Sequence, residues 1–295
     1  MITYRSLTQA LAQIGVQPEG VLLAHVADDF AARVVGGADS VLGALLANTH
    51  GLLLPAFTRR CEVVPPIGPP DNGIDYAAQH GLSLQAEFFR ADLPPDPGQA
   101  TVAEALRPKP GAARSSHPLL SFFGWQAEDL LAAQTLQTPL APLAQLAATD
   151  GDILLMGADH RHSTAIHYAE AMAGRRTFLR WALTPAGVRE CPGMPGCAEG
   201  FEALDERLTG IDRRLELDGR PLRLLPLRDL VHVVVGWIRQ DPRALLCDRA
   251  ECAMCSAVRA NVRAETGGLP RRRPWGRRRS LWAGHRRASV RRPAS

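Results

Sequence analysis

The sequence predicts an α/β protein, in which strands alternate with helices around a central sheet. Three short apolar runs, 21–26, 51–55 and 152–157, have the length and composition of buried strands. Stretches with helical periodicity lie between and after them, and the sequence has no internal repeat. Because 46% of the 295 residues are hydrophobic, the chain can bury the sizeable core that this class of fold requires.

The first element is an amphipathic helix. Ser6 offers a hydroxyl suited to an N-cap, and Gln9 follows at the third helical position, which is the spacing of a capping box. Leu11 and Ile14 then supply the apolar side chains of one helix face.

A strand, a helix and a second strand follow in close succession. The strand over 21–26 ends at the pair Asp28-Asp29, a helix is expected over 38–47, and the second strand covers 51–55. Because the three elements fit into about 35 residues, they indicate a crossover connection and a parallel pair of strands.

Residues 61–100 hold many of the prolines and show no clear periodicity. A segment this long without regular structure is typically a functional lid or binding loop, or else is disordered, and the sequence leaves both open. A short helix over 101–106 and a loop over 110–118 come next.

The clearest buried strand, 152–157, leads through residues 158–164 into a helix that carries His167 and Glu170. Two further strands are expected on either side of a turn at 185–187, and residues 225–239 have the pattern of a mostly apolar helix.

The net charge is distributed unevenly along the chain. Residues 266–295 contain ten arginines and no acidic residue, whereas the whole chain has a formal charge of only +4, so residues 1–265 carry −6. We therefore predict a globular domain over 1–263 and a disordered, arginine-rich tail over 264–295. Arginines beside Trp275 and Trp282 can bind nucleic acid. The same composition is typical of GC-rich DNA translated past its normal stop, so we do not expect a nucleic-acid partner.

Several classes of protein are excluded. The sequence has no Walker loop, no Gly-x-Gly-x-x-Gly and no Gly-x-Ser-x-Gly, which argues against P-loop phosphoryl transfer and against an α/β-hydrolase. The longest uncharged stretch, 40–58, is interrupted by a turn at 48–51 and by Pro55, so we expect no membrane span. Six cysteines without a signal-peptide pattern indicate reduced thiols and a cytoplasmic location.

A candidate catalytic group lies at residues 163–170. His167 and Glu170 are three residues apart and share a helix face, as do Thr164 and His167. A carboxylate beside an imidazole fixes its tautomer and raises its basicity, as a general base requires. The start of the helix favours developing negative charge. An ordinary surface Glu–His pair has the same pattern.

Two groups of residues have the chemistry of metal ligands. Asp159-His160-x-His162 presents two imidazoles from one loop, but no third or fourth ligand is defined. Five cysteines form the second group: Cys247, Cys252 and Cys255, with Cys191 and Cys197 further back in the chain. Their spacing does not repeat the Cys-x-x-Cys pair of a zinc knuckle. We interpret them as packed free thiols and expect no metal.

Several blocks of the sequence follow one another in the order of a known family. The central blocks are Pro110-Gly111-Ala112-x-Arg114-Ser115-x-His117-Pro118-x-x-Ser121-Phe122, Asp150-Gly151-x-Ile153-Leu154-Leu155-Met156-Gly157 and Thr164-x-x-His167-x-x-Glu170. Cys197-x-x-Gly200-Phe201 and Cys252-x-x-Cys255 extend the match. In these blocks, which span residues 1–262, the sequence resembles the aminoglycoside 3-N-acetyltransferases.

The resemblance implies a three-layer α/β/α fold with a central sheet that is mostly parallel or mixed. It also implies transfer of an acetyl group from acetyl-CoA to an amine, at the 3-N position of an aminoglycoside antibiotic. His167 would act as general base, oriented by Glu170, while Thr164 or backbone amides stabilise the oxyanion. The residues implied for binding the acyl donor are His25, Arg114, Ser115, His117 and Ser121.

A polycationic acceptor calls for an acidic pocket. Asp71 and Asp75 are the candidates, because they follow the predicted strand end at 55–58, where the resembling family places an acidic group. Carboxylates there would hold ammonium groups and shift their pKa. A solvated turn over 69–75 explains the same residues equally well.

Three positions depart from the family pattern. Its His-Ser-Ser segment reads His25-Val26-Ala27, the Asn of its Asn-Thr-x-x-His motif is Ser163, and a His near its active site is replaced by Gln137-Thr138. Two hydroxyls expected near the donor are thereby lost. Two alternatives stay open: an acyl-CoA N-acyltransferase acting on another amine metabolite, and a vestigial member that serves as a binding protein.

Overall fold

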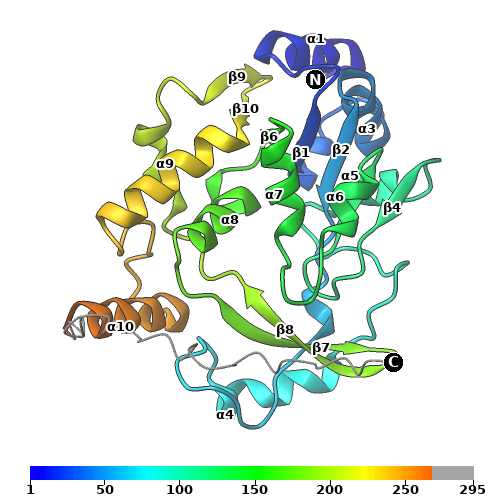
Figure 1. Ribbon diagram of the computed structural model, residues 1–295. Helices are drawn as coiled ribbons and strands as arrows, with labels where there is room; N and C mark the ends of the chain where they lie inside the picture. The colour runs from blue at the N-terminus through cyan, green and yellow to red at the C-terminus, as the bar shows by residue number, and fades with distance from the viewer. Residues whose placement is uncertain (268–295) are drawn as a thin grey trace, which may run out of the picture.

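A seven-stranded mixed sheet forms the centre of the structure, a computed structural model that describes residues 1–267 (Figure 1). The strands lie in the order β4-β5-β2-β1-β6-β10-β9. Their bounds are β1 Val21–Val26, β2 Gly51–Pro55, β4 Ala112–Arg114, β5 Phe122–Trp125, β6 Asp152–Met156, β9 Arg213–Leu217 and β10 Arg220–Pro226.

The middle of the sheet is parallel and its edges are antiparallel. β1 pairs in parallel with β2, where Val21 lies opposite Gly51, and with β6, where Leu22 lies opposite Asp152. β5 and β10 flank these strands in the antiparallel sense, and β4 and β9 extend the edges. The predicted parallel pair is confirmed, with the helix α3 (Gly37–Asn48) as its crossover.

Helices cover both faces of the sheet and bury two separate cores. Leu23, Leu53 and Leu155 pack into the core on one face, whereas their neighbours Leu22 and Leu52 pack into the core on the other. Because successive side chains of a strand point to opposite faces, the continuous apolar runs are explained. The first face carries α6 (Glu128–Ala132), α7 (Ala141–Ala148), α8 (Thr164–Met172) and α9 (Leu227–Gln240). The second carries α1 (Tyr4–Ile14), α2 (Asp28–Ala31), α3 and α5 (Ala100–Leu106).

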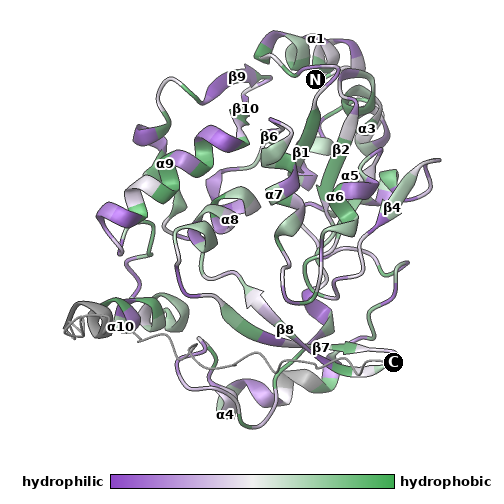
Figure 2. Ribbon diagram, viewed as in Figure 1, coloured by the Kyte–Doolittle hydropathy of each residue, from purple (hydrophilic) through white to green (hydrophobic). Residues whose placement is uncertain are grey.

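This arrangement is the three-layer α/β/α fold that the resemblance implied. Figure 2 shows hydrophobic residues along β1 and β2, which lie between the two helix layers, whereas α9 alternates hydrophobic and hydrophilic residues. Only one side of α9 faces the core, and Leu230, Val234 and Ile238 on that side are buried.

A second, three-stranded sheet lies beyond the carboxyl ends of the parallel strands (Figure 1). It consists of β3 (Glu62–Val63), β7 (Phe178–Thr184) and β8 (Gly187–Met194), in the order β3-β7-β8. The two strands predicted around the turn at 185–187 are β7 and β8, which form an antiparallel hairpin.

The proline-rich segment has little regular structure, as expected, but its path is held by specific contacts. It contains η1 (Arg59–Cys61), β3, α4 (Tyr76–Gln79) and η2 (His80–Gln85). The buried side chain of Asn72 bonds to both the amide and the carbonyl of Leu179 on β7, at 2.9 and 2.8 Å. Asp96 accepts a hydrogen bond from the amide of Arg59. The proline-rich segment is therefore packed against the rest of the domain in a defined conformation.

The chain then runs through η3 (His160–His162) and η4 (Phe201–Leu208) and reaches α10 (Ala253–Gly267). The predicted domain boundary at 263 falls inside α10, and the tail beyond Gly267, residues 268–295, lies outside the described residues. Among the described residues, no helix is both long and apolar enough to cross a membrane.

Two predicted boundaries are corrected. The N-cap of α1 is Thr3 rather than Ser6: the Ser6 amide donates to Thr3 Oγ1 at 3.1 Å, and the Thr3 amide donates to Ser6 Oγ at 2.9 Å. Ser6 thus occupies the position expected for Gln9. The apolar helix begins at Leu227, because Leu225 still pairs with Ile153 in the sheet and Pro226 ends that strand.

Replacing Thr3 by Ala should lower the free energy of unfolding by about 1 kcal/mol, because the Ser6 amide loses its side-chain acceptor. Replacing Ser6 by Ala should have a similar cost. The double variant should lose less than the sum, since the two hydroxyls also bond to each other, with Thr3 Oγ1 3.1 Å from Ser6 Oγ, and either single substitution already removes that bond. Urea unfolding monitored by circular dichroism measures all three, and strictly additive losses would contradict the capping box.

Candidate functional site

A cleft opens where the parallel strands end. It has a volume of about 360 Å³ and adjoins a second hollow of about 210 Å³, with which it shares Phe57, Arg59, Gln99 and His162. The lining comes from the segments that follow β2, β6 and β8, and from α10. In open α/β sheets, ligands bind at the carboxyl ends of the strands, so this cleft is the candidate site.

His167 and Glu170 are in contact on α8. His167 Nδ1 lies 2.9 Å from one oxygen of the buried Glu170, whose other oxygen accepts a hydrogen bond from Arg175 at 2.6 Å. Arg175 also donates to the carbonyls of Pro242 and Ala244. A solvated surface pair would not be held from two sides in this way, and that interpretation of the sequence is wrong.

These contacts fix the imidazole in one tautomer. Because an ionised carboxylate only accepts hydrogen bonds, the proton of neutral His167 lies on Nδ1, and Nε2 keeps its lone pair. The ring packs edge-on against Phe201, with centroids 4.7 Å apart, and lines the cleft. Both the rotation and the tautomer of His167 are therefore set by its neighbours.

His25 and Thr164 meet at the floor of the site. His25 lies on β1, fully buried, with Nδ1 3.1 Å from the side-chain oxygen of Gln99 and Nε2 3.3 Å from Thr164 Oγ1. Burial lowers the pKa of His25 to about 4, so its ring is neutral at neutral pH. No motif in the sequence indicates Gln99, which lies in an irregular segment 74 positions after His25.

The N-terminus of α8 points the positive end of its dipole toward the same place. α8 begins at Thr164, and no side chain caps it. The hydroxyl of Ser163, which stands where the resembling family has Asn, is buried and has no hydrogen-bond partner among the described residues. Unpaired polar groups at a helix N-terminus are suited to bind a negatively charged oxygen.

Arg114, Ser115 and Ser121 have structural contacts. Arg114 donates to Ser121 Oγ at 3.0 Å and to the carbonyl of Ala56 at 2.7 Å, and also to the carbonyl of Leu93. Its guanidinium lies over the rings of Phe89 and Phe123. Ser115 Oγ accepts from the Phe122 amide, and Ser121 Oγ donates to the Ala56 carbonyl. These contacts tie β5 to the segment after β2 and to the proline-rich segment, and none of these three residues lines the cleft.

His117 is buried in the same loop but keeps one unused donor. Its Nδ1 accepts from the amides of Leu119 and Leu120, at 3.2 and 3.0 Å. Burial lowers the pKa of His117 to about 4, so the proton of the neutral ring lies on Nε2. Among the described residues, no atom accepts a hydrogen bond from that nitrogen.

Asp71 and Asp75 do not line the cleft. Both are exposed, and Asp75 caps α4 by accepting from the Ala78 amide at 3.1 Å. The turn that carries them contacts Met254 through Gly73, and Met254 does line the cleft. The two aspartates therefore lie one layer behind the lining. Gln137 and Thr138, at the position of the missing His, are exposed and also lie outside it.

Sequence reasoning missed the charged residues that do line the cleft. They are Arg59, Arg161, Arg249 and Glu199. Arg161 pairs with Asp159, and it lies 3.8 Å from Glu199. No spacing or motif brings these residues together, because they come from four different loops.

The two groups of residues with the chemistry of metal ligands differ in the structure. His160 is buried and faces Asp205, whereas His162 is exposed in the cleft and bonds to Asp159, so the two imidazoles do not converge. Four of the five cysteines, by contrast, lie together: Cys197, Cys247, Cys252 and Cys255. The fifth, Cys191, is buried separately on β8.

Comparison with known proteins places the chain among the acetyltransferases it resembles. The model of the family described as aminoglycoside 3-N-acetyltransferase matches residues 23–239. Aminoglycoside N(3)-acetyltransferase VII of Streptomyces paromomycinus is 27% identical over 281 residues, covering 81% of this chain and 92% of that protein.

Solved structures agree with the fold. The apoenzyme of aminoglycoside acetyltransferase AAC(3)-IVa has a TM-score of 0.71 and 25% identity, over 88% of this chain and 97% of that chain. AAC-IIIb, solved as a binary complex with CoASH, has a TM-score of 0.63 and 22% identity, over 81% of this chain and 96% of that one, which is a likeness of fold.

Replacing Arg114 by Met should lower the free energy of unfolding by about 2–4 kcal/mol, because buried carbonyl groups lose their donor. The same change at the exposed Arg33 should stay within about 0.5 kcal/mol. Denaturant unfolding measures both. If Arg114→Met keeps its stability and instead loses affinity for acetyl-CoA in calorimetry, Arg114 acts on the donor and the structural role is wrong.

Proposed function

The chain belongs to the aminoglycoside 3-N-acetyltransferase family, and on that premise we propose that it transfers the acetyl group of acetyl-CoA to an amine of an aminoglycoside. The observation that carries the proposal is the contact chain from His167 through Glu170 to Arg175 at the cleft. In this reaction a nitrogen–carbon bond forms, the thioester carbon–sulfur bond breaks, and the amine must lose a proton.

His167 is suited to take that proton. An ammonium has no lone pair for attack, so a base has to act either on it or on the attacking amine. Nε2 of His167 has the free lone pair, and Glu170 stabilises the imidazolium that results. Arg175 holds the Glu170 carboxylate in place, and that carboxylate in turn orients His167.

The start of α8 is suited to hold the negative charge that develops on the carbonyl oxygen. Thr164 supplies a hydroxyl there, and the first turn supplies backbone amides and the positive end of the helix dipole. The Gln99 side-chain oxygen beside His25 Nδ1 can only accept a hydrogen bond, so the neutral ring carries its proton on Nδ1 and its Nε2 accepts from the Thr164 hydroxyl. While the Thr164 proton is directed at His25, the backbone amides and the helix dipole of the first turn are the groups free to hold the developing charge.

The cleft also fits the acyl donor. Acetyl-CoA supplies the acetyl group as an activated thioester and carries phosphates that need positive partners. Arg59, Arg161 and Arg249 line the cleft and provide that charge. Within residues 1–267, the buried hydroxyl of Ser163 and Nε2 of His117 have no hydrogen-bond partner, although neither residue is part of the cleft lining. The arginines of the lining support donor binding even though Val26 and Ala27 replace two hydroxyls.

On the acceptor side, we assign the cationic group to Glu199. It is the carboxylate that lines the cleft together with His167, and it remains 47% exposed. The formal charge of −6 on residues 1–265 adds a long-range attraction for a polycationic acceptor. Asp71 and Asp75 can add to this field from behind the lining.

A second candidate is transfer to another amine metabolite that also carries an anionic group. The balance of three arginines to one glutamate in the cleft lining favours it. For either acceptor we propose a cytoplasmic enzyme, since acetyl-CoA is an intracellular co-substrate and all six cysteines are free thiols.

Purified protein incubated with acetyl-CoA and a panel of aminoglycosides should release free CoA thiol, which a thiol-reactive dye measures continuously. His167→Ala should lower kcat by about 10²–10⁴-fold, because the amine is no longer deprotonated. The exposed His50, at the opposite end of β2, gives the matched control His50→Ala, which should keep full activity. No thiol release with any aminoglycoside, or an active His167→Ala variant, would contradict the proposal.

Glu199→Gln should raise KM for a cationic acceptor about fivefold to tenfold with a smaller effect on kcat, because one ion pair in the cleft is lost. The exposed Glu128 on α6 provides the control Glu128→Gln, with an unchanged KM. Asp71→Asn tests the competing assignment. If Asp71→Asn raises KM more than Glu199→Gln, the acceptor lies at the turn over 69–75.

A further inference from the structure

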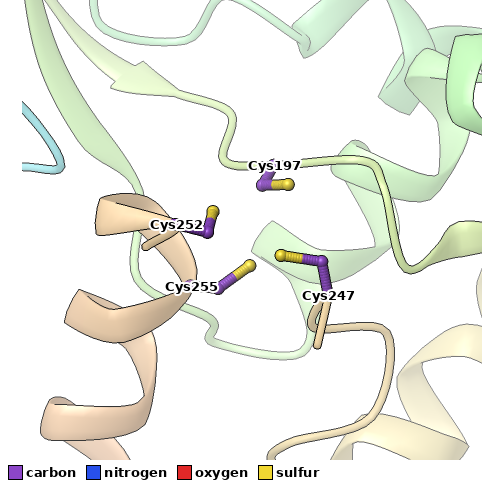
Figure 3. Close-up of side chains that lie close together, drawn as sticks. All are labelled: Cys197, Cys247, Cys252 and Cys255. Carbon is purple, nitrogen blue, oxygen red and sulfur yellow. The ribbon is translucent and has the colours of Figure 1, made fainter. Parts of the chain in front are cut away.

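Four cysteine side chains gather around one point beside the cleft. Cys197 follows β8, Cys247 follows α9, and Cys252 and Cys255 lie at the start of α10. Their sulfur atoms all lie within 4.8 Å of one another. Figure 3 shows the four side chains turned toward a shared space from these three segments.

We propose that the four thiolates bind one zinc ion as a structural site. Zinc bound by four sulfurs at about 2.3 Å requires sulfur–sulfur edges of about 3.8 Å. Sulfur atoms within 4.8 Å of one another need to move closer by about 1 Å at most to reach that tetrahedron. Because all four positions are occupied by protein ligands, the site has no open position for a substrate.

Two features of the backbone allow the segments that carry Cys197 and Cys247 to approach closely. At Gly200, three residues after Cys197, a Cβ would lie 2.5 Å from the carbonyl oxygen of Leu245, so only glycine permits the approach. Leu245, two residues before Cys247, has a φ of +64°, a conformation that costs energy for a branched side chain. A strained residue and an obligatory glycine on the two facing segments indicate that their closeness is maintained by a further interaction.

The surroundings of the sulfurs suit thiolates. The backbone at Glu199 favours the thiolate of Cys197 and the backbone at Arg249 favours that of Cys247, each two residues after its cysteine. The guanidinium of Arg249 also interacts with both of these cysteines, which offsets the negative charge of four thiolates around a divalent ion. Burial and the other sulfurs raise the pKa of Cys255, and a cation between them would reverse this shift.

The second group with ligand chemistry lacks these features. His160, Asp205 and Asp212 also lie close together, but Arg223 forms ion pairs with both aspartates and Arg214 adds two more. Guanidinium groups already supply the positive charge there. At the cysteine cluster, Arg249 interacts with the sulfurs of Cys197 and Cys247, whereas Arg259 donates to the backbone carbonyl of Cys247.

The zinc ion would stabilise the two segments that hold Phe201 and Arg175, the side chains that position His167 and Glu170. Phe201, which packs against the ring of His167, is four residues after Cys197. Arg175, which holds Glu170, bonds to the carbonyls of Pro242 and Ala244, just before Cys247. The ion thus cross-links the two segments that orient His167 and Glu170, and it fixes Glu199, Arg249 and Met254 in the cleft wall.

Metal analysis of the full chain, purified without chelating resin under reducing conditions, should give one zinc per protein. X-ray absorption at the zinc edge of the same sample should show four sulfur neighbours at about 2.3 Å. Both measurements use the unaltered protein, so they do not depend on whether a variant folds. Zinc well below one per chain after reloading, iron in its place, or oxygen and nitrogen neighbours would overturn the proposal.

Cys197→Ala and Cys255→Ala should each lose at least tenfold in zinc affinity, measured by competition with a chromophoric chelator. The buried cysteines outside the cluster give matched controls, Cys61→Ala and Cys191→Ala, which should keep one zinc per chain. Equal zinc loss in the controls, or a disulfide between cluster cysteines in peptide mapping, would refute the site. Acetyl transfer can fail without affecting these readouts, so the two proposals are tested separately.

Discussion

The parallel pairing of β1 with both β2 and β6 brings the carboxyl ends of three strands side by side. The position of the cleft depends on this pairing. β1 carries His25 to the edge, β6 leads into α8 with Thr164 and His167, and β2 leads into the segment with Phe57 and Arg59. Both faces of these strands are buried under helices, so the edge cannot shift without exposing two cores. The side chains of His25, Thr164 and His167 are therefore held in place by the packing of the whole sheet.

Features encoded by neighbouring residues were predictable from the sequence. The strands at 21–26, 51–55 and 152–156 follow from apolar composition, and the His167–Glu170 contact follows from a spacing of three on a helix. Features that depend on distant partners were not. Gln99 meets His25 across 74 residues, and Arg175, which contacts Glu170, is also held by the carbonyls of Pro242 and Ala244 from beyond α9. Neither partner has a local pattern that distinguishes it from a surface residue.

Residues of a family motif also show how far a sequence pattern can predict the role of a side chain. The family-like block at 110–122 predicts donor binding for Arg114, Ser115 and Ser121, and this stays a prediction, while the contacts of these side chains hold β5 against the segment after β2. A sequence pattern records that residues occur together and does not separate binding from support. The negative net charge of residues 1–265 led us to expect an acidic pocket. The charge of the cleft lining differs from that net charge, because three arginines from separate segments of the chain line the cleft.

The position of α10 has a consequence for the order in which the molecule forms during synthesis. All strands of the central sheet, and the helices α1 to α9, have been made once residue 240 has been added. The cleft then still lacks Arg249 and Met254 from its wall, as well as Cys247, Cys252 and Cys255 beside it. During synthesis the sheet is therefore available before the cleft wall, and residues 244–258 complete both that wall and one of the two cores.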